Sequence, residues 1–530
     1  MESMIMSQYK WVASWCGVAM VMVVPWKILE WAWFKPKRLE KYLRQQGLIG
    51  TTYKLPFGDT KEIMNTTKLE PMNLSDDIMP RVMPFVHRSI QNYGKIFFSW
   101  FGPVPAVHII DPDVVRDVLS RMNEFQKPKK NNPYIEILST GVIQYEGDKW
   151  SKHRKIINPT FHTEKLKLMV PAMCLSCHEM IKRWETSFSN EKSLELDVFP
   201  DLQTLTGDVI SRTAFGSSYE EGRKIFELQK EMGLILMHVL QSLYIPGLRF
   251  LPNSRNKRMV EIDRELKGLI RNMIDKRMIA MEAGETGQDD LLGLLLKSNY
   301  DEIQKSGNQR HGMTIDEVIE ECKLFYFAGN ETVGNLLVWT MVLLSRNPHW
   351  QELARDEAFH MFGNNQPDID GLSRLKIVNM ILLEVLRLYP AASTLYRMSV
   401  EETRVGGVNI PEGTLIILPI LALHHDQDTW GDDALEFNPN RFALGVSNAA
   451  SKGQLSFLPF GGGPRICIGQ NFAMLEAKIA LVMILRRFSF VLSPSYSHAP
   501  QSIITLQPQF GAHLILKQVQ ASQEINITQE

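Results

Sequence analysis

The sequence predicts a mainly α-helical domain with a small β region, preceded by one N-terminal transmembrane helix. Apolar residues recur at helical spacing over most of the chain after residue 112. Stretches with strand character are short and few, and Gly and Pro turn signals bound them. An uncharged run from Trp11 to Trp26 supplies the membrane segment.

That apolar run is shorter than the roughly 20 residues that cross a bilayer, but continuing it to Phe34 gives enough length. Lys27 and Glu30 would then lie near the lipid headgroups. A cleaved secretory signal is the alternative, but it needs basic residues before the run and a small-residue cleavage site after it. Here the positive charges follow the run, which predicts a cytoplasmic location for the remainder of the chain: Lys35, Lys37, Arg38, Lys41 and Arg44.

These features divide the chain into three parts. We expect a membrane anchor over residues 1–34, a basic, glycine-containing linker over residues 35–50, and one soluble domain over residues 51–530. The 58 basic side chains of the whole chain face 59 acidic ones, for a net charge of −1. This balance argues against a nucleic-acid-binding protein, whose affinity would depend on an excess of Lys and Arg.

Helices are expected to dominate the soluble part, beginning with residues 112–119 after the short strand Val107–Ile110. Further strands are expected over Arg404–Ile410 and Thr414–Leu418. No GxGxxG follows a strand and no Walker loop is present, so nicotinamide or flavin chemistry must come from another protein. The longer expected helices are Glu164–Trp184, Pro200–Ala214, Tyr219–Leu243, Arg258–Ala283, Thr314–Arg346 and Gln351–Phe362.

The cysteines are odd in number and scattered, which predicts a reducing compartment and no disulfide framework. Cys467 stands in a glycine-rich segment, Phe457–Gly469, directly before an expected helix. Backbone N–H groups and the helix dipole favour a thiolate at such a place. A buried structural cysteine is the alternative, but the spacing F-x-x-G-x-R-x-C-x-G fixes five positions in ten. The five cysteines are Cys16, Cys174, Cys177, Cys322 and Cys467.

A second cysteine motif, Cys174-Leu-Ser-Cys177-His178, matches the pattern for covalent haem attachment. That chemistry requires an export pathway, which the predicted orientation denies. The motif also lies within the expected helix Glu164–Trp184, where cysteines serve as small apolar residues. We therefore interpret it as structural.

Thr314 and Glu317 are in capping-box relation at the start of the helix expected over Thr314–Arg346. A polar cluster interrupts the apolar middle of that helix. Ala328 and Thr332 share one face at i, i+4, which leaves room for a diatomic ligand and a hydrogen bond to it. Glu331 can relay protons, and Gly329 is expected to loosen the helix. A polar face turned toward solvent is the alternative for this segment.

These two segments resemble the haem-binding loop and the A/G-G-x-D/E-T oxygen-activation motif of the cytochrome P450 family. The resemblance implies the mainly α fold of that family, with haem b as cofactor and Cys467 as the axial ligand of its iron. It implies catalytic roles for Thr332 and Glu331, and contacts of Phe460 and Ala328 with the haem.

Further motifs occur in the order typical of that family. Glu384-Val-Leu-Arg387 and the Arg441 of Phe437–Phe442 match its structural Glu, Arg and Arg, which are expected to form a buried network. Guanidinium groups pair well with carboxylates, so cationic side chains and one tryptophan are expected to hold the haem propionates. By position these residues are Trp150, Arg154, Arg397 and Arg465.

Finer features are similar to plant family 72, subfamily A. That resemblance implies insertion of one oxygen atom into a C–H bond of a terpenoid: a triterpenoid, an iridoid or a gibberellin. It also implies NADPH–cytochrome P450 reductase and membrane lipid as partners, and a single-pass location in the endoplasmic reticulum membrane. A haem-thiolate isomerase or dehydratase that does not use O₂, and a non-catalytic haem-binding protein, remain as alternatives. The matching segments are Asn158–His162, Glu321–Phe325, Gly469–Ala473 and Leu506–Gln509.

Overall fold

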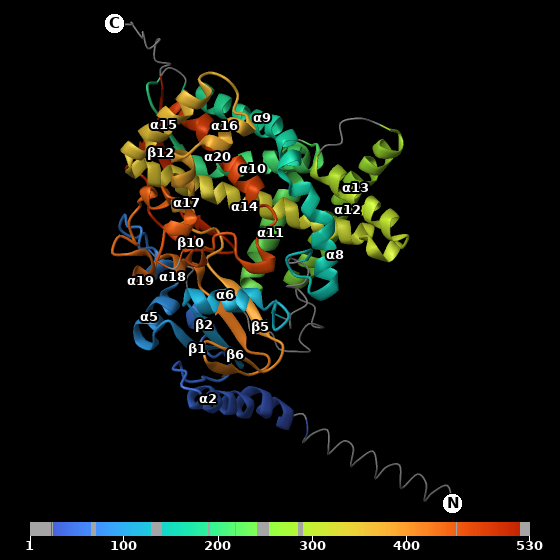
Figure 1. The fold of residues 1–530 in the computed structure, drawn as a ribbon, viewed down its shortest axis with the longest axis vertical. Helices are drawn as coiled ribbons and strands as arrows, with labels where there is room; N and C mark the ends of the chain where they lie inside the picture. Colours follow the sequence, from blue (N-terminus) through green and yellow to red (C-terminus); the bar gives the residue numbers. More distant parts are fainter. Residues whose placement is uncertain are drawn as a thin grey trace, which may run out of the picture. The chain divides into compact units, whose positions relative to one another are not determined.

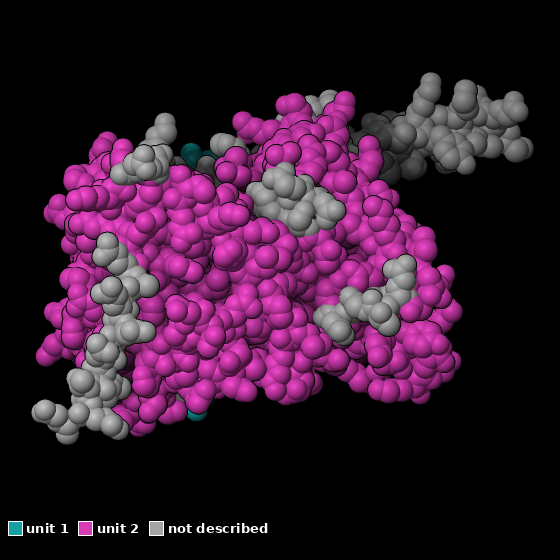
Figure 2. All heavy atoms as spheres, turned by 90° about the horizontal axis from the view of Figure 1, so that it is seen from above, with its two compact units in different colours: residues 1–65, 84–128, 396–418 teal, residues 66–83, 129–395, 419–530 magenta. Residues whose placement is uncertain are grey.

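The structure is a computed structural model that describes residues 23, 25–64, 70–128, 140–188, 191–217, 219–240, 254–284, 290–451 and 453–519. Its chain divides into two compact units, which are coloured teal and magenta in Figure 2. Unit 1 comprises residues 1–65, 84–128 and 396–418, and unit 2 comprises residues 66–83, 129–395 and 419–530.

Unit 1 is built on a mixed sheet with the strand order β1-β2-β8-β5-β3. Strand β2 pairs antiparallel with β1 and parallel with β8, so the strands predicted near residues 107–110 and 414–418 lie side by side. The single strand expected over Arg404–Ile410 is a two-stranded hairpin with Gly406-Gly407 at its turn. The strands are β1 (Ile96–Phe101), β2 (Val104–Ile109), β3 (Phe125–Gln126), β5 (Leu395–Ser399), β6 (Thr403–Val405), β7 (Val408–Ile410) and β8 (Leu415–Leu418).

Short helices accompany this sheet. The side chain of Asp111 accepts hydrogen bonds from the N–H groups of Asp113 and Val114, so the predicted helix begins at its N-cap. The segment expected as a linker holds helix α2, in which Leu43 is fully buried. The helices are η1 (Glu30–Phe34), α2 (Lys35–Gln45), α3 (Thr60–Met64), α5 (Pro84–Tyr93) and α6 (Pro112–Ser120).

The membrane anchor predicted over residues 1–34 lies largely outside the described residues, which begin with Val23. Among the helices that the structure describes, none combines the length and the apolar character that a bilayer crossing requires.

Unit 2 is mainly helical, as predicted. The long helix α14 packs against α10, α12, α17 and α20, and its residues from Val333 to Ser345 are buried (Figure 1). The unit contains α4 (Met79–Val82), α8 (Gly147–Ile157), α9 (Thr163–Ser187), α10 (Val198–Phe215), α11 (Tyr219–Leu240), α12 (Ser254–Glu282), α13 (Leu291–Ser306), α14 (Ile315–Arg346), α15 (Pro348–Phe362), α16 (Ile369–Arg374), α17 (Ile377–Leu388), α18 (Ile420–His424), α19 (Gln427–Trp430) and α20 (Gln470–Leu485).

Two small β elements complete unit 2. A three-stranded antiparallel sheet has the order β4-β12-β9, and β10 pairs with β11 in a hairpin. The helix after Cys467 ends at Leu485, because Phe488 already belongs to a strand. The strands are β4 (Leu194–Asp197), β9 (Phe488–Leu492), β10 (Pro500–Ser502), β11 (Leu506–Pro508) and β12 (His513–Gln518).

Candidate active site

Cys467 closes a tight loop directly before α20. Its N–H donates to the carbonyl of Phe460 at 2.9 Å. Gly461 and Gly463 adopt φ values of 73° and 66°, which side chains with a Cβ rarely tolerate. Burial among the surrounding atoms raises the pKa of the Cys467 thiol, while the N–H of Gly469 and the charge of Arg154 oppose that rise. A metal ion at this sulfur would remove the proton outright.

Three of the four residues predicted to hold propionates gather around this loop. Arg154 Nη1 donates to the carbonyl of Ile466 at 2.8 Å. Arg465 donates to the carbonyl of Tyr145 at 2.8 Å, and its guanidinium lies 4.8 Å from the centre of the Trp150 ring. Trp150, Arg154 and Arg465 therefore share one corner of unit 2 with Cys467.

The charges at this corner favour a ligand that carries carboxylates. Burial lowers the pKa of both Arg154 and Arg465. Arg465 is ion-paired with Glu146, yet its Nε is buried without a hydrogen-bond partner. Among the described residues, no carboxylate forms an ion pair with Arg154. Haem, with its two propionates, fits this donor set and the adjacent thiol.

Arg397, the fourth predicted propionate residue, lies in β5 of unit 1. Its side chain is almost fully buried, and Nη1 donates to the carbonyl of Tyr396 at 2.9 Å. Its predicted contact with a propionate therefore stays a prediction.

The oxygen-activation motif lies in an unbroken part of α14. The predicted capping box is confirmed, with Thr314 and Glu317 exchanging hydrogen bonds at the N-terminus. Residues 327–332 are half-buried, although the residues on either side of them are buried. The Thr332 hydroxyl donates to the carbonyl of Ala328 at 2.8 Å. The Thr332 hydroxyl and the Ala328 carbonyl thus share one face of α14, as the i, i+4 spacing predicts.

Gly329 serves close packing and does not loosen the helix. A Cβ at this position would lie 2.7 Å from Cδ1 and 2.8 Å from Cγ1 of Ile210 on α10. The helix continues through Gly329 without a break. The expectation that this glycine weakens α14 was therefore wrong, because its absent side chain is what lets α10 approach.

Phe161 connects the oxygen-activation helix to the cysteine loop. Its ring centre lies 5.9 Å from that of Phe325 on α14 and 6.4 Å from that of Phe472 on α20. A Cβ on Gly469 would lie 3.9 Å from the Phe161 ring. The sequence indicated Phe161 only as part of the segment Asn158–His162, which is similar to the family. Contacts between residues so far apart in the sequence leave no periodic signal.

Glu384, Arg387 and Arg441 form the predicted buried network. Glu384 and Arg387 are both 0% exposed and join through two hydrogen bonds of 2.8 Å. Arg387 Nη1 also donates to the carbonyls of His424 and Ala434, at 2.8 and 2.6 Å. Arg441 Nε lies 3.6 Å from Glu384 Oε1. The two charges are thus buried with most of their hydrogen bonds satisfied.

His424 connects the Glu384–Arg387 network to the cysteine loop by hydrogen bonds. This role was not predicted from the sequence. The His424 Nε2 atom accepts from the N–H of Leu458 at 2.9 Å, so Nδ1 carries the proton toward the carbonyl of Arg387, 3.2 Å away. Burial lowers the pKa of His424 to about 3, which keeps the ring neutral in this tautomer. In the sequence, His424 and its neighbour His425 follow an apolar segment, a pattern that indicates no specific partner.

A buried pair joins α8 to α14. His153 Nδ1 lies 2.6 Å from Glu321 Oε1, and both side chains are 0% exposed. Nearby lysines pair within the protein: Lys149 with Glu317 at 3.0 Å, and Lys155 with Glu302 at 2.5 Å. The His153–Glu321 and Lys149–Glu317 pairs hold the helix that carries Trp150 and Arg154 against the oxygen-activation helix, and the Lys155–Glu302 pair joins it to α13.

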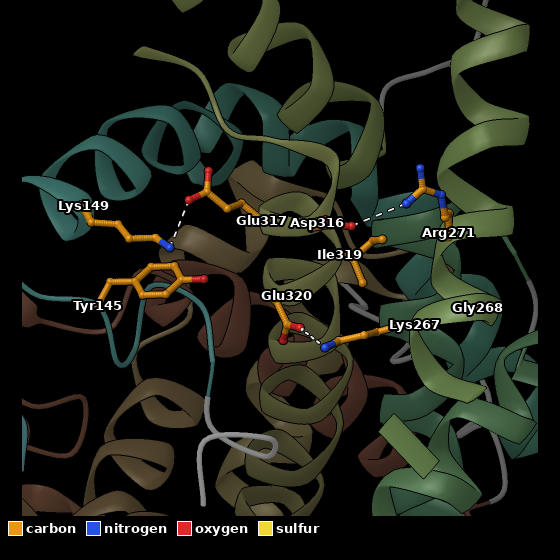
Figure 3. A pocket seen from close by; sticks show the side chains of 9 residues that line it. All are labelled: Tyr145, Lys149, Lys267, Gly268, Arg271, Asp316, Glu317, Ile319 and Glu320. Carbon is orange, nitrogen blue, oxygen red and sulfur yellow. Dashed lines mark hydrogen bonds and ion pairs between the residues drawn. The ribbon is translucent and has the colours of Figure 1, made fainter. Parts of the chain in front are cut away.

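A pocket of about 500 Å³ lies between α8, α12 and α14, and neither Cys467 nor Thr332 lines it (Figure 3). The charged residues at its wall are already paired, as Figure 3 shows for Lys267 with Glu320 and for Arg271 with Asp316. It therefore offers no reactive group. Its lining residues are Tyr145, Lys149, Lys267, Gly268, Arg271, Asp316, Glu317, Ile319 and Glu320.

The Cys174–His178 motif is structural, as interpreted from the sequence. Cys174 and Cys177 are buried on α9, and burial raises the pKa of the Cys174 thiol to about 11. Neither thiol is therefore suited to covalent attachment of a haem.

Comparison with known proteins decides the family. The cytochrome P450 family model matches residues 81–511. The chain belongs to the cytochrome P450 family. It is 57% identical to cytochrome P450 CYP72A219 of Panax ginseng over 96% of this chain and 98% of that one. It is also 51% identical to 7-deoxyloganic acid hydroxylase of Catharanthus roseus, over 94% and 97% of the two chains.

The fold agrees with this assignment. The structure of retinoic acid-bound cyanobacterial CYP120A1 superposes with a TM-score of 0.74 and 22% identity, covering 89% of this chain and 99% of that one. The chain is therefore a cytochrome P450 monooxygenase, an oxidoreductase with a haem-thiolate cofactor. Cys467 is the residue of the family's haem-binding motif, and the described donor set around it fits that group.

Replacing Arg387 by Ala is expected to abolish haem incorporation. The variant leaves Glu384 buried without its main partner, which costs about 3–5 kcal/mol. The measurement is the haem-to-protein ratio of purified protein, together with its thermal unfolding. Lys167→Ala is the matched control, because Lys167 forms an i, i+3 pair with Glu164 whose side chains are 42% and 80% exposed. Normal haem content in Arg387→Ala would contradict the assigned role.

Gly329→Ala is expected to destabilise the enzyme, because the new Cβ meets Ile210 at 2.7 Å. Overpacking of this kind costs about 1–3 kcal/mol. Thermal unfolding should show a lower Tm for Gly329→Ala and partial recovery in the double variant Gly329→Ala, Ile210→Val. If the second substitution lowers the Tm further by its full single-variant effect, the two sites do not couple.

Proposed function

We propose that this enzyme inserts one oxygen atom from O₂ into a C–H bond of a lipophilic plant terpenoid of the triterpenoid, iridoid or gibberellin class. The observation that carries the proposal is the combination of the Cys467 loop with an intact Ala328–Thr332 motif on α14. The 51% identity to 7-deoxyloganic acid hydroxylase supports the hydroxylation. When bound, a haem with a cysteine thiolate ligand supplies the dioxygen activation and O–O cleavage.

The residues around the site have separate tasks. Cys467 would hold the iron, while Trp150, Arg154 and Arg465 would orient the propionates, with Arg397 as a further ligand. Phe460 and Ala328 would contact the haem, and Glu384, Arg387 and Arg441 would support the loop. The positions of Arg154 and Arg465 beside the loop and the buried Glu384–Arg387 pair support this division.

Glu331 and Thr332 handle protons. The Thr332 hydroxyl donates to the carbonyl of Ala328 and would donate to a ligand bound beside that face of α14. Burial raises the pKa of Glu331. A carboxyl group with a raised pKa retains its proton closer to neutral pH, as a proton donor must. Glu331 then gives its proton to water and recovers one from solvent.

Electrons reach the enzyme from NADPH through NADPH–cytochrome P450 reductase. The chain has neither a dinucleotide-binding fingerprint nor a Walker loop, so a separate protein must supply them. Residues 1–34 anchor the enzyme in the endoplasmic reticulum membrane, and residues 51–530 form the cytoplasmic catalytic domain. Residues 35–50 lead from the anchor into unit 1 and hold helix α2, which buries Leu43.

Yeast microsomes that contain this enzyme and a plant reductase are expected to oxidise at least one member of a terpenoid panel in an NADPH-dependent way, as measured by mass spectrometry.

Thr332→Ala should retain haem but recover several-fold less of the NADPH electrons in product, since protons are delivered less well. Cys467→Ser should lose the red-shifted Soret band of the reduced, carbon monoxide-treated protein. Product formation without NADPH would contradict the proposed reaction.

Removal of residues 1–34 is expected to release the enzyme from membranes during carbonate extraction, while the full chain stays in the pellet. The physical reason is the loss of a run long enough to span the hydrocarbon core. A full chain that is extracted by carbonate would contradict the anchor.

A further inference from the structure

Trp430 lies against both arginines of the buried network. The guanidinium carbon of Arg387 is 5.1 Å from the centre of the Trp430 ring, and that of Arg441 is 6.0 Å from it. The tryptophan is itself almost fully buried at the end of α19, and its indole N–H donates to the carbonyl of Leu423 at 3.0 Å. One ring therefore contacts two cations in a region from which water is largely excluded.

The two arginines share a single buried carboxylate. Arg387 Nη2 donates to Glu384 Oε1 at 2.8 Å, and Arg441 Nε lies 3.6 Å from the same oxygen. That Nε is buried and makes no hydrogen bond within the described part of the chain. Asp433 pairs with Arg441 Nη2 at 2.9 Å, but its side chain is 38% exposed, so solvent screens much of its charge. The buried charges of this network therefore have a positive excess.

The face of an indole ring can compensate such an excess. An aromatic ring has negative charge density on its face, and a guanidinium within about 6 Å of the ring centre is attracted to it. The attraction is strongest where water is absent. Arg441 contacts this tryptophan in a second way, because its Nη1 donates to the carbonyl of Trp430 at 2.8 Å.

The same ring packs on the start of the cysteine loop. The centre of the Trp430 ring lies 6.1 Å from that of Phe457 and 6.3 Å from that of His424, with both ring pairs close to perpendicular. Phe457 stacks on His424 at 5.5 Å, and His424 accepts the N–H of Leu458. Trp430 thus contacts both the arginines and the residues that hold the loop.

We propose that Trp430 is a positioning residue, whose ring face stabilises the Arg387 and Arg441 cations and thereby holds the cysteine loop in the form that binds haem. This inference rests on the proposed support of the loop by Glu384, Arg387 and Arg441. Trp430 acts through those arginines and not through contact with a ligand.

The test weakens the charge of the ring face and keeps its shape. Trp430 alone is replaced, by nonsense-codon suppression, with tryptophans that carry one, two or three ring fluorines, which withdraw electron density from the face. The rate of haem transfer from the full-length holoenzyme to excess apomyoglobin is then measured. We expect this rate to rise with each fluorine, to about tenfold for three, which is within the strength of a desolvated cation–π contact. A rate that does not depend on fluorination would overturn the proposal, because fluorine leaves the packing nearly unchanged.

Trp339 provides a matched control. It is also buried, and its indole N–H donates to a backbone carbonyl at 3.0 Å, that of Leu506, but its ring stacks on Tyr389 rather than on a cation. The same fluorinated residues in place of Trp339 should leave the haem transfer rate at its wild-type value. An equal rise at both positions would also overturn the proposal, since any fluorinated residue in the core would then accelerate haem loss.

Two ordinary substitutions give a second measurement. Trp430→Phe and Trp430→Leu both remove the N–H that bonds to Leu423, but only Phe keeps an aromatic face. The reduced, carbon monoxide-treated Trp430→Phe protein should retain most of its red-shifted Soret band, whereas Trp430→Leu should lose most of it. Bands of equal size in the two variants would contradict the role of the ring face.

These measurements need no substrate, so they separate this proposal from the proposed function. If fluorination of Trp430 accelerates haem transfer but no terpenoid is oxidised, the positioning holds and the assigned reaction is wrong. If Arg387→Ala loses haem and fluorination of Trp430 has no effect, the support of the loop holds and the role of Trp430 is wrong.

Discussion

The burial of Arg387 is the constraint on which the cysteine loop depends. A guanidinium with no solvent exposure must have its charge balanced and its N–H groups accepted within the protein. Glu384 supplies the charge, and the carbonyls of His424, Ala434 and Glu436 supply acceptors. These carbonyls lie on the segment that leads to the loop. Arg387 therefore fixes the backbone between residues 424 and 436, a segment with little regular structure. The neutral ring of His424 in turn accepts a hydrogen bond from the N–H of Leu458 in the cysteine loop.

Arg154 and Arg465, which lie beside the cysteine loop, have fewer hydrogen-bond and ion-pair partners than Arg387 in the described part of the chain. Arg154 and Arg465 are also withdrawn from solvent, and burial lowers the pKa of both. Arg465 has one carboxylate partner, and its Nε has none. Arg387, in contrast, donates to one carboxylate and to three backbone carbonyls. The side of the loop with Arg154 and Arg465 therefore has the cationic groups that an acidic ligand needs.

Most of the helical fold was predictable, because apolar periodicity and caps are local signals. The capping box at Thr314 and the Asp111 N-cap both occur where the sequence placed them. The site residues of the cysteine loop and of α14 were predictable from motif spacing. Partners distant in sequence were not: Phe161, His424 and Thr505 act through contacts over long separations, and nothing in their neighbourhoods indicates them. Gly329 was misinterpreted for a related reason, since its role is defined by Ile210 on another helix.

Buried polar groups and close packing make opposite demands on α14, and its sequence satisfies both by dividing its faces. On the face toward α10, the helix has Gly329, whose lack of a side chain lets Ile210 approach closely. Toward the β10–β11 hairpin it presents Asn335, a fully buried amide that would be costly in an apolar core without partners. Thr505 and Gln203 supply those partners from two other elements. The amide of Asn335 is therefore satisfied by side chains that come from segments far away in the sequence.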